Sequence, residues 1–278
     1  MVGQWALGER LGRGGQGSVY LAARGEGPEF AAAKVLNLSR PKKRARFLQE
    51  VEAHASLSAR KAPNIIPIID HDVHELSEPE DGVEGYIVMP RAKWSLEDLT
   101  DLYRGRVELC LETFIGITNG IATAHREGVI HRDIKPANVL FLDLSCREPL
   151  VSDFGICLLK ETAETARITD VGESVGARWF MAPEQEVGGM SDIQFSADVY
   201  ALGKLLHYML TARHLPREKL SDAFTEPELR NDVRLIVIQE EILARAIVED
   251  PTARLQTSSE LLTIGLEVLR SFRRAPRS

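Results

Sequence analysis

Residues 131–140 read HRDIKPANVL, and residues 153–155 read DFG. The longer stretch begins with ionisable side chains and ends with aliphatic ones, so it predicts a polar loop at the edge of a packed core. Asp133 offers a carboxylate that can receive the proton of a hydroxyl group. Asn138 and Asp153 carry oxygen atoms of the kind that Mg²⁺ prefers as ligands. The two stretches together therefore indicate a chemical site.

The composition is that of an ordinary soluble globular protein, with 44% hydrophobic and 27% charged residues. A length of 278 residues is long for one compact domain and allows two lobes. The net charge of −7 argues against a broad nucleic-acid-binding face. The three cysteines form no CxxC pair, and no apolar run approaches the roughly 20 residues of a membrane-spanning helix. We therefore expect a cytoplasmic protein without nucleic acid or membrane as a partner.

The order of expected elements divides the chain into a strand-rich part and a helical part. Residues 1–38 predict short strands separated by glycine-rich turns, and residues 41–59 have the apolar spacing of an amphipathic helix. Two further strands are expected at residues 64–76 and 85–92. The remaining predicted helices cover residues 109–127, 196–210, 232–248 and 257–272. This order predicts an α+β fold with an N-terminal lobe (1–89), a connector (90–95), a helical lobe (96–278) and a cleft between the lobes.

A glycine-rich stretch near the N-terminus, LGRGGQGSVY, fits the pattern GxGxxGxV at Gly12, Gly14, Gly17 and Val19. Glycines let a backbone approach phosphate groups closely, although a simple hairpin turn would have the same composition. A P-loop is excluded because Ser18 stands where that motif needs lysine. A dinucleotide-binding turn is excluded because a strand-like segment, not a helix, follows the glycines. A mononucleotide site and a plain turn both stay open on this motif alone.

Lys34 lies in the apolar strand-like sequence AAAKVL. Lysine is seldom buried without a partner, and Glu50 in the predicted helix is the candidate. The pair can be a structural ion pair, or, together with the glycine-rich stretch, a cation held against nucleotide phosphates.

These motifs in this order resemble the eukaryotic-type protein kinase family over roughly residues 7–265. The resemblance continues with MAPE (181–184), DVYALG (198–203) and DPTAR (250–254). It implies a two-lobed protein kinase fold, in which a small lobe with an antiparallel sheet and one helix joins a larger, mainly helical lobe. It also implies transfer of the γ-phosphoryl group of Mg²⁺-bound ATP to protein hydroxyls. Lys135 in HRDxKxxN is more similar to serine/threonine than to tyrosine kinases. A pseudokinase or nucleotide-binding scaffold is the alternative.

The resemblance assigns roles to individual residues. Asp133 is the implied catalytic base, Lys135 contacts the γ-phosphate, and Asn138 and Asp153 hold Mg²⁺. Lys34 binds the α- and β-phosphates while Glu50 orients it. The implied ATP-binding residues are Leu11, Gly12, Arg13, Gly14, Gly15, Gln16, Gly17, Ser18, Val19, Ala32, Lys34, Glu50, Met89, Pro90, Ala92, Leu140 and Asp153. Pro90 lacks an N–H group, but its position needs only a carbonyl toward adenine, and Ala92 donates the N–H.

Four further residues are expected to support the site. We expect His131 to be a packed structural residue and Asp198 to hold the catalytic segment. Glu184 and Arg254 resemble a buried ion pair that braces the helical lobe.

Residues 156–180 correspond to the activation loop of the family. Its candidate phosphorylation sites are Thr162, Thr165, Thr169 and Ser174. Ala177 stands where serine/threonine kinases usually carry a threonine, which keeps the pseudokinase alternative open. Arg132 implies a cationic pocket for a phosphate on this loop. Regulation is expected from the loop, from dimerisation or from a separate partner.

Glu173 stands where many kinases have their activating phosphothreonine. We hypothesise that its carboxylate partly mimics phosphate toward Arg132; the alternative is a solvated glutamate. Under the first hypothesis, Glu173→Gln removes the charge that attracts Arg132 and lowers the turnover number of phosphoryl transfer. Unchanged turnover in a steady-state assay would contradict the mimicry and favour the solvated glutamate.

Overall fold

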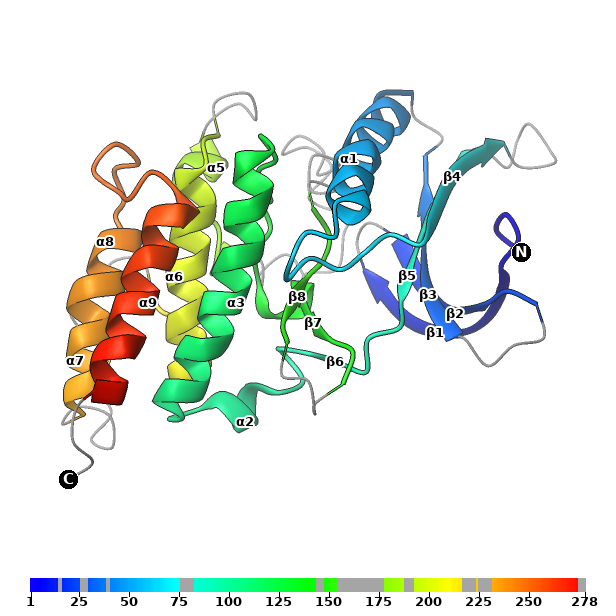
Figure 1. The fold of residues 1–278 in the computed structure, drawn as a ribbon. Helices are drawn as coiled ribbons and strands as arrows, with labels where there is room; N and C mark the ends of the chain where they lie inside the picture. Colours follow the sequence, from blue (N-terminus) through cyan, green and yellow to red (C-terminus); the bar gives the residue numbers. More distant parts are fainter. Residues whose placement is uncertain are drawn as a thin grey trace.

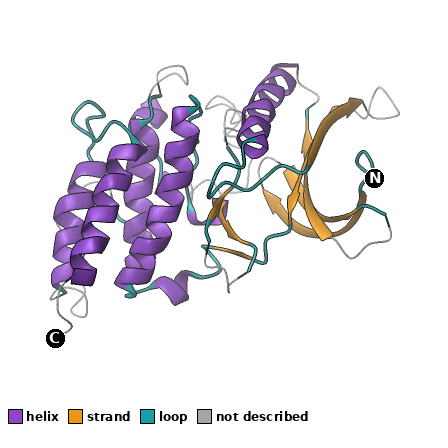
Figure 2. Ribbon diagram, in the orientation of Figure 1, coloured by secondary structure: helices purple, strands orange, loops and turns teal. Residues whose placement is uncertain are grey.

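The computed structural model describes most of the chain. The described residues are 1–14, 17–25, 30–38, 41–75, 83–143, 148–154, 178–187, 193–216, 224 and 232–274. The longer strands gather in one lobe together with one helix, and the other long helices form the second lobe (Figures 1 and 2). Of the described helices, none has both the length and the apolar character needed to cross a membrane.

The N-terminal lobe is built on a five-stranded antiparallel sheet with the order β1-β2-β3-β5-β4. Its strands are β1 (Ala6–Gly14), β2 (Gly17–Ala23), β3 (Phe30–Asn37), β4 (Asp70–Glu75) and β5 (Val83–Pro90). Helix α1 (Pro41–Ala59) packs Phe47 and Val51 against Leu36 and Ile87 of the sheet. The predicted strands and the predicted helix are therefore present, because alternating apolar side chains on β3 give both faces something to bury.

The two faces of β3 have different surroundings. Val2 and Trp5 from the N-terminal segment cover the face of the sheet that carries Ala33 of β3 and Val88 of β5. The Trp5 indole N–H also donates a hydrogen bond to Asp70 (2.7 Å). The N-terminal residues thus close one face of the sheet, and Lys34 points to the opposite face.

The C-terminal lobe is mainly helical, as predicted. Its longer helices are α3 (Val107–Arg126), α6 (Ser196–Thr211) and α9 (Ser258–Arg274), and its shorter ones are α2 (Thr100–Tyr103) and α5 (Glu184–Val187). The single helix expected at residues 232–248 is instead a succession of α7 (Val233–Ile238), a π-helical turn (Gln239–Leu243) and α8 (Ala244–Ala246). A π-helical turn accommodates an extra residue within a helix, which apolar periodicity does not reveal.

A small three-stranded sheet lies between the five-stranded sheet and the helices of the C-terminal lobe (Figure 2). It consists of β6 (Trp94–Ser95), β7 (Val139–Phe141) and β8 (Leu150–Val151). Strand β7 is the aliphatic end of HRDIKPANVL, and its residues Val139 and Phe141 are buried. The polar beginning of this stretch therefore stands at the edge of a packed core, as predicted.

The predicted strand at residues 64–76 is only partly correct. Strand β4 begins at Asp70, whereas the preceding residues run beside β8. The Ile66 N–H donates to the carbonyl of Val151 (3.0 Å). Pro67 lacks the N–H group that would continue a ladder in the large sheet, which gives a physical reason for the late start.

This early part of the segment attaches the N-terminal lobe to α3. Asn64 has a left-handed backbone (φ 59°), and its side chain donates to the Pro149 carbonyl (3.1 Å) and accepts from Asn119 (3.0 Å). Gly120 of α3 makes the approach possible, since a Cβ at Gly120 would lie 2.7 Å from the Asn64 carbonyl oxygen. The Asn64 carbonyl cannot easily move because it also accepts from Val151 N–H (2.8 Å).

Replacing Gly120 with alanine should therefore lower the free energy of unfolding by about 1–3 kcal/mol through overpacking. The matched control is Gly265→Ala in α9, where the added Cβ would meet its nearest atom at 3.4 Å. The control should be neutral or slightly stabilising, because alanine favours a helix over glycine. Urea denaturation of the three proteins measures the difference, and equal stability of the two variants would contradict the proposed contact.

Candidate active site

A buried carboxylate anchors the segment that contains Asp133. Asp198 of α6 is 1% exposed and accepts hydrogen bonds from the backbone N–H groups of His131 (2.7 Å) and Arg132 (2.8 Å). The His125 imidazole donates a third (2.9 Å). Burial opposes ionisation, but the hydrogen bonds and positive charge around it hold the pKa of Asp198 below its ordinary value. Asp198 thus holds the segment that contains Asp133, which the sequence predicted to be catalytic.

Three of the predicted functional side chains meet within this segment. The Lys135 ammonium lies 2.7 Å from the Asp133 carboxylate. Asn138 donates through its amide nitrogen to the Asp133 carbonyl (2.7 Å) and carboxylate (3.2 Å). Because the amide nitrogen is used in this way, the amide oxygen of Asn138 is the atom available as a metal ligand.

Lys34 and Asp153 form an ion pair that joins the two lobes. The Lys34 ammonium lies 2.8 Å from the Asp153 carboxylate, and the Lys34 side chain is only 9% exposed. Burial would raise the pKa of Asp153, but the adjacent ammonium outweighs it and holds this pKa below its ordinary value. The Glu50 side chain, which the sequence offered as the partner of Lys34, lies outside the described part. The partner that the structure shows is therefore one the sequence did not predict.

Phe154 of the DFG motif stands between two histidine rings. The ring centroids of His131 and Phe154 are 4.8 Å apart, and those of His54 and Phe154 are 5.2 Å apart. His131 is completely buried, and its Nε2 donates to the Ser152 carbonyl (2.8 Å). His131 is therefore a packed structural residue, as predicted. His54 was not predicted; its only signal in the sequence is its place one helical turn after Glu50.

The residues expected around adenine lie in one apolar cluster. Val19, Ala32, Met89 and Leu140 belong to this cluster, which joins the sheet to β7 of the other lobe. Leu11, which was also expected there, is 39% exposed and is not part of this cluster. The structure thus brings together apolar residues from four segments that are distant in sequence.

The connector between the lobes carries the two remaining residues expected to contact adenine. Pro90 is the last residue of β5 and is paired with Ala31. Ala92 follows the end of that strand and is partly buried. Their backbone contacts with a nucleotide stay predictions.

Two glycines of the GxGxxGxV stretch differ in what surrounds them. A Cβ on Gly12 would meet no atom within 4 Å, whereas a Cβ on Gly17 would lie 2.2 Å from the Val35 carbonyl oxygen. Gly17 is thus required by packing, and Gly12 faces open space where a phosphate could approach the backbone. Gly15 and Gln16 lie outside the described residues.

The arrangement suits a Mg²⁺-bound nucleotide. Among the described residues, no group of three or more His, Cys, Asp or Glu side chains is placed to hold a metal ion. Magnesium usually needs only one or two protein ligands and takes the rest from substrate phosphates and water. Asn138 and Asp153 fit that requirement.

The ion pair expected in the helical lobe is present. The Arg254 guanidinium binds both carboxylate oxygens of Glu184 (2.6 and 3.1 Å) and has no exposed side-chain surface. Arg254 also donates to the carbonyls of Ser196 (2.9 Å) and Val248 (2.8 Å). These bonds connect α5 to α6 and to the segment that follows α8.

The predicted features of the activation loop cannot be placed. Gly155 and residues 156–177 lie outside the described part of the structure. This range contains the candidate phosphorylation sites Thr162, Thr165, Thr169 and Ser174, together with Glu173 and Ala177.

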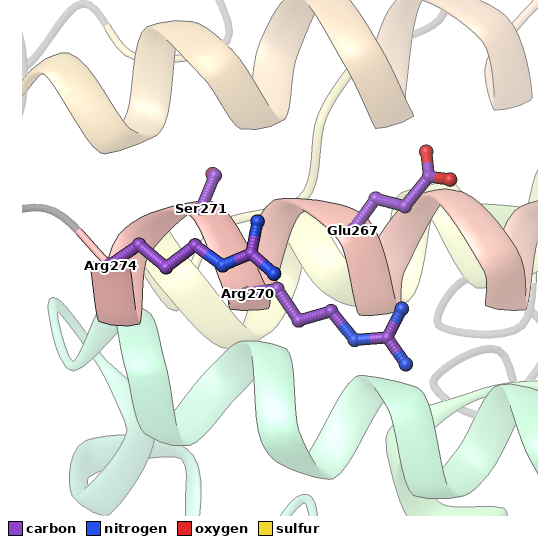
Figure 3. A pocket seen from close by; sticks show the side chains of 4 residues that line it. All are labelled: Glu267, Arg270, Ser271 and Arg274. Atoms are coloured by element: carbon purple, nitrogen blue, oxygen red, sulfur yellow. The ribbon is translucent and has the colours of Figure 1, made fainter.

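A surface hollow of about 480 Å³ lies along α9 (Figure 3). Its lining consists of Glu267, Arg270, Ser271 and Arg274. None of these residues was predicted as functional, and all lie on the solvent-exposed side of one helix.

Known proteins match nearly the whole length of this chain. A sequence model described as "Protein kinase domain" matches residues 5–267. The chain belongs to the protein kinase family. A probable serine/threonine-protein kinase of Streptomyces coelicolor is 32% identical to this kinase chain. The match covers 93% of this chain and 39% of the relative. A probable serine/threonine-protein kinase PknB of Bifidobacterium longum is 30% identical, with coverage of 94% and 39%.

Solved structures agree with the two-lobed kinase fold. The PknI kinase domain of Mycobacterium tuberculosis superposes with a TM-score of 0.68 at 23% identity, covering 95% of this chain and 96% of that chain. The predicted fold is therefore confirmed. The kinase chain spans about 39% of the length of the two bacterial relatives.

The position of His54 predicts a pH-dependent stability. Burial lowers the pKa of His54 from 6.5 to about 4, so the folded protein keeps this imidazole neutral where the unfolded chain already binds a proton. The contribution of the neutral His54 to the free energy of unfolding is fully present above about pH 6.5 and is lost as the pH falls toward 4. A decrease from about pH 7.5 to pH 5 should therefore lower the free energy of unfolding by about 2 kcal/mol.

Urea denaturation at both pH values tests this for the wild type and His54→Gln, which keeps a donor toward the Ile66 carbonyl. The variant should show a smaller decrease in stability. His71→Gln makes the same change at an exposed histidine and should keep the wild-type pH dependence. Parallel curves for the wild type and His54→Gln would show that His54 is not the titrating group.

Proposed function

We propose that this chain is an ATP- and Mg²⁺-dependent protein kinase that transfers the γ-phosphoryl group to serine or threonine hydroxyls of proteins. The observation that carries the proposal is the 2.8 Å ion pair between Lys34 of β3 and Asp153 after β8. This pair brings a cation of one lobe and a carboxylate of the other to one point. Asp133 is near enough to influence the ionisation of Asp153. Phosphoryl transfer needs this combination of a cation, metal-ligand oxygens and a carboxylate.

In this proposal the nucleotide binds between the apolar cluster and the glycine-rich turn. Val19, Ala32 and Leu140 would enclose the adenine. The Pro90 carbonyl and the Ala92 N–H would form hydrogen bonds with its edge. Lys34 would bind phosphate oxygens, because a buried ammonium attracts anionic oxygens more strongly than an exposed one. Glu50 on α1 would orient Lys34 when the nucleotide is bound.

Asn138 and Asp153 would hold the metal ion. The depressed pKa of Asp153 keeps its carboxylate ionised at neutral pH, which is the state a metal ligand needs. When bound, Mg²⁺ supplies positive charge that neutralises the phosphate oxygens. The amide oxygen of Asn138 is available because its nitrogen is bound to Asp133.

Asp133 would orient the attacking hydroxyl and receive its proton. The side chain of Asp133 is 9% exposed, and Lys135 and Asn138 both contact it. These contacts hold the carboxylate in one orientation. Less conformational entropy is therefore lost when the acceptor hydroxyl is placed against it for the reaction. Lys135 would contact the γ-phosphate from its place beside Asp133.

The acceptor class is proposed from two observations. Lys135 stands in the sequence HRDxKxxN, and the relatives named above are called serine/threonine-protein kinases. The boundaries 1–89, 90–95 and 96–278 are proposed for the two lobes and their connector. A cytoplasmic location and control by dimerisation or by a separate regulator stay predictions from the sequence.

Transfer of labelled phosphate from ATP in the presence of Mg²⁺ tests the proposal. Asp133→Asn should lower the turnover number by at least about 100-fold, since it removes the proton acceptor. Asp153→Ala should abolish transfer because it removes both a metal ligand and the partner of Lys34. Asp101→Asn, a change at an exposed carboxylate of α2, is the matched control and should keep the wild-type rate.

Mass spectrometry of the products identifies the acceptor. Phosphoserine or phosphothreonine is expected on the chain itself or on added protein, and phosphotyrosine would contradict the proposed acceptor class. A wild-type protein that binds ATP and transfers no phosphate would support the pseudokinase alternative.

A further inference from the structure

The backbone at Arg132 is in a conformation that few non-glycine residues adopt. Its φ angle is 69°, in the left-handed region, which costs free energy for a residue with a Cβ. Such a conformation persists only where the surroundings hold it. The Arg132 N–H donates to Asp198 (2.8 Å), and the Arg132 carbonyl accepts from the side chain of Gln185 (3.0 Å). Both backbone polar groups of this residue are thus bound by side chains.

The Gln185 amide is bound at both of its ends. Its nitrogen donates to the Arg132 carbonyl, and its oxygen accepts from the backbone N–H of Ala182 (3.0 Å). These partners determine the orientation of the amide, because a carbonyl needs a donor and an N–H needs an acceptor. Gln185 therefore connects the segment MAPE to the catalytic segment.

Helix α5, which carries Gln185, is itself held in place. The neighbouring residue Glu184 forms the bidentate ion pair with the buried Arg254. The Gln185 backbone N–H also donates to the Ala182 carbonyl (3.0 Å). The backbone of Gln185 is thus held in place. Its side-chain amide can therefore hold the Arg132 carbonyl in a defined position.

The carbonyl that Gln185 binds belongs to the peptide group that joins Arg132 to Asp133. The N–H of the same peptide group donates to Nδ1 of His131 (3.2 Å). Because the two polar groups of a peptide lie in one plane, binding both of them fixes the rotation of that plane. Rotation of this plane would change ψ of Arg132 and φ of Asp133, and with them the direction in which the Asp133 side chain leaves the backbone.

We propose that Gln185 is a positioning residue for phosphoryl transfer, which holds the peptide between Arg132 and Asp133 so that the Asp133 carboxylate faces the acceptor hydroxyl. The inference rests on the proposed kinase function. It assigns Gln185 no contact with ATP, with the metal or with the acceptor. The amide transmits the position of α5 to the catalytic segment through one hydrogen bond at each end.

Two substitutions separate positioning from a role in holding the MAPE segment alone. Gln185→Met keeps the length of the side chain and removes both hydrogen bonds. Gln185→Glu keeps an acceptor for the Ala182 N–H, but its carboxylate cannot donate to the Arg132 carbonyl. If Gln185 positions Asp133, both variants should be impaired; if it only supports Ala182, the glutamate variant should behave like the wild type.

Steady-state phosphorylation of dephosphorylated casein by the full chain provides the first readout. The turnover number should fall about 10- to 100-fold in both variants, as expected for a misplaced reacting group, while the KM for ATP stays within about twofold. Gln194→Met is the matched control at an exposed glutamine before α6, and it should keep the wild-type turnover number. A wild-type turnover number in Gln185→Glu would overturn the proposal.

Hydrogen exchange of the backbone amides provides a readout that does not depend on activity. Residues 131–134 should exchange faster in both variants, and Ala182 should exchange faster only in Gln185→Met. Unchanged exchange at residues 131–134 would overturn the proposed coupling, whether or not the protein transfers phosphate. A wild-type chain without transfer would instead refute the kinase function itself.

Discussion

The hydrogen bonds from two consecutive backbone N–H groups to the buried Asp198 carboxylate hold the catalytic segment on α6. Asp198 lies in the core of the helical lobe, where a carboxylate is costly unless it is fully hydrogen-bonded. His131 and Arg132 both direct their backbone N–H groups at it, and Arg132 itself has a left-handed backbone. Asp133 is the next residue. One buried charge thus holds the backbone immediately before the group proposed to receive the proton.

The second dependence lies between the lobes. Lys34 and Asp153 belong to different layers of the molecule and meet at 2.8 Å, where each charge offsets the cost of burying the other. Lys34 lies on β3 and Asp153 follows β8, next to Phe154, whose ring packs between the tilted rings of His54 and His131. The junction at Asn64 and Gly120 attaches the same lobe to α3 at another point. The relative placement of the lobes is therefore held by a few specific contacts around a small sheet.

Several parts of the fold and of the site could be predicted from local patterns. A short apolar run predicted β3 as a buried strand, and the spacing of Phe47 and Val51 predicted α1. Pro67 shows the limit of such patterns. The apolar run around it resembled one long strand, but Ile66, before the proline, bonds to Val151 of β8, and Ile69, after it, bonds to Val88 of β5. Strand β4 begins only at Asp70. The π-helical turn after α7 was missed because π-helical turns are rare, and a helical apolar pattern is assigned to the commoner α-helix.

The sequence by itself determined which chemical groups the site contains and in what order: Lys34 in an apolar strand, Asp133 and Asn138 five residues apart, and Asp153 in a second motif. Residue type and spacing are local properties, so they can be read without coordinates. Only the tertiary structure decided that Lys34 pairs with Asp153, that His54 packs on Phe154 and that Gln185 binds the Arg132 carbonyl. Each of these contacts joins residues far apart in the chain, and their distances are set by how the layers pack.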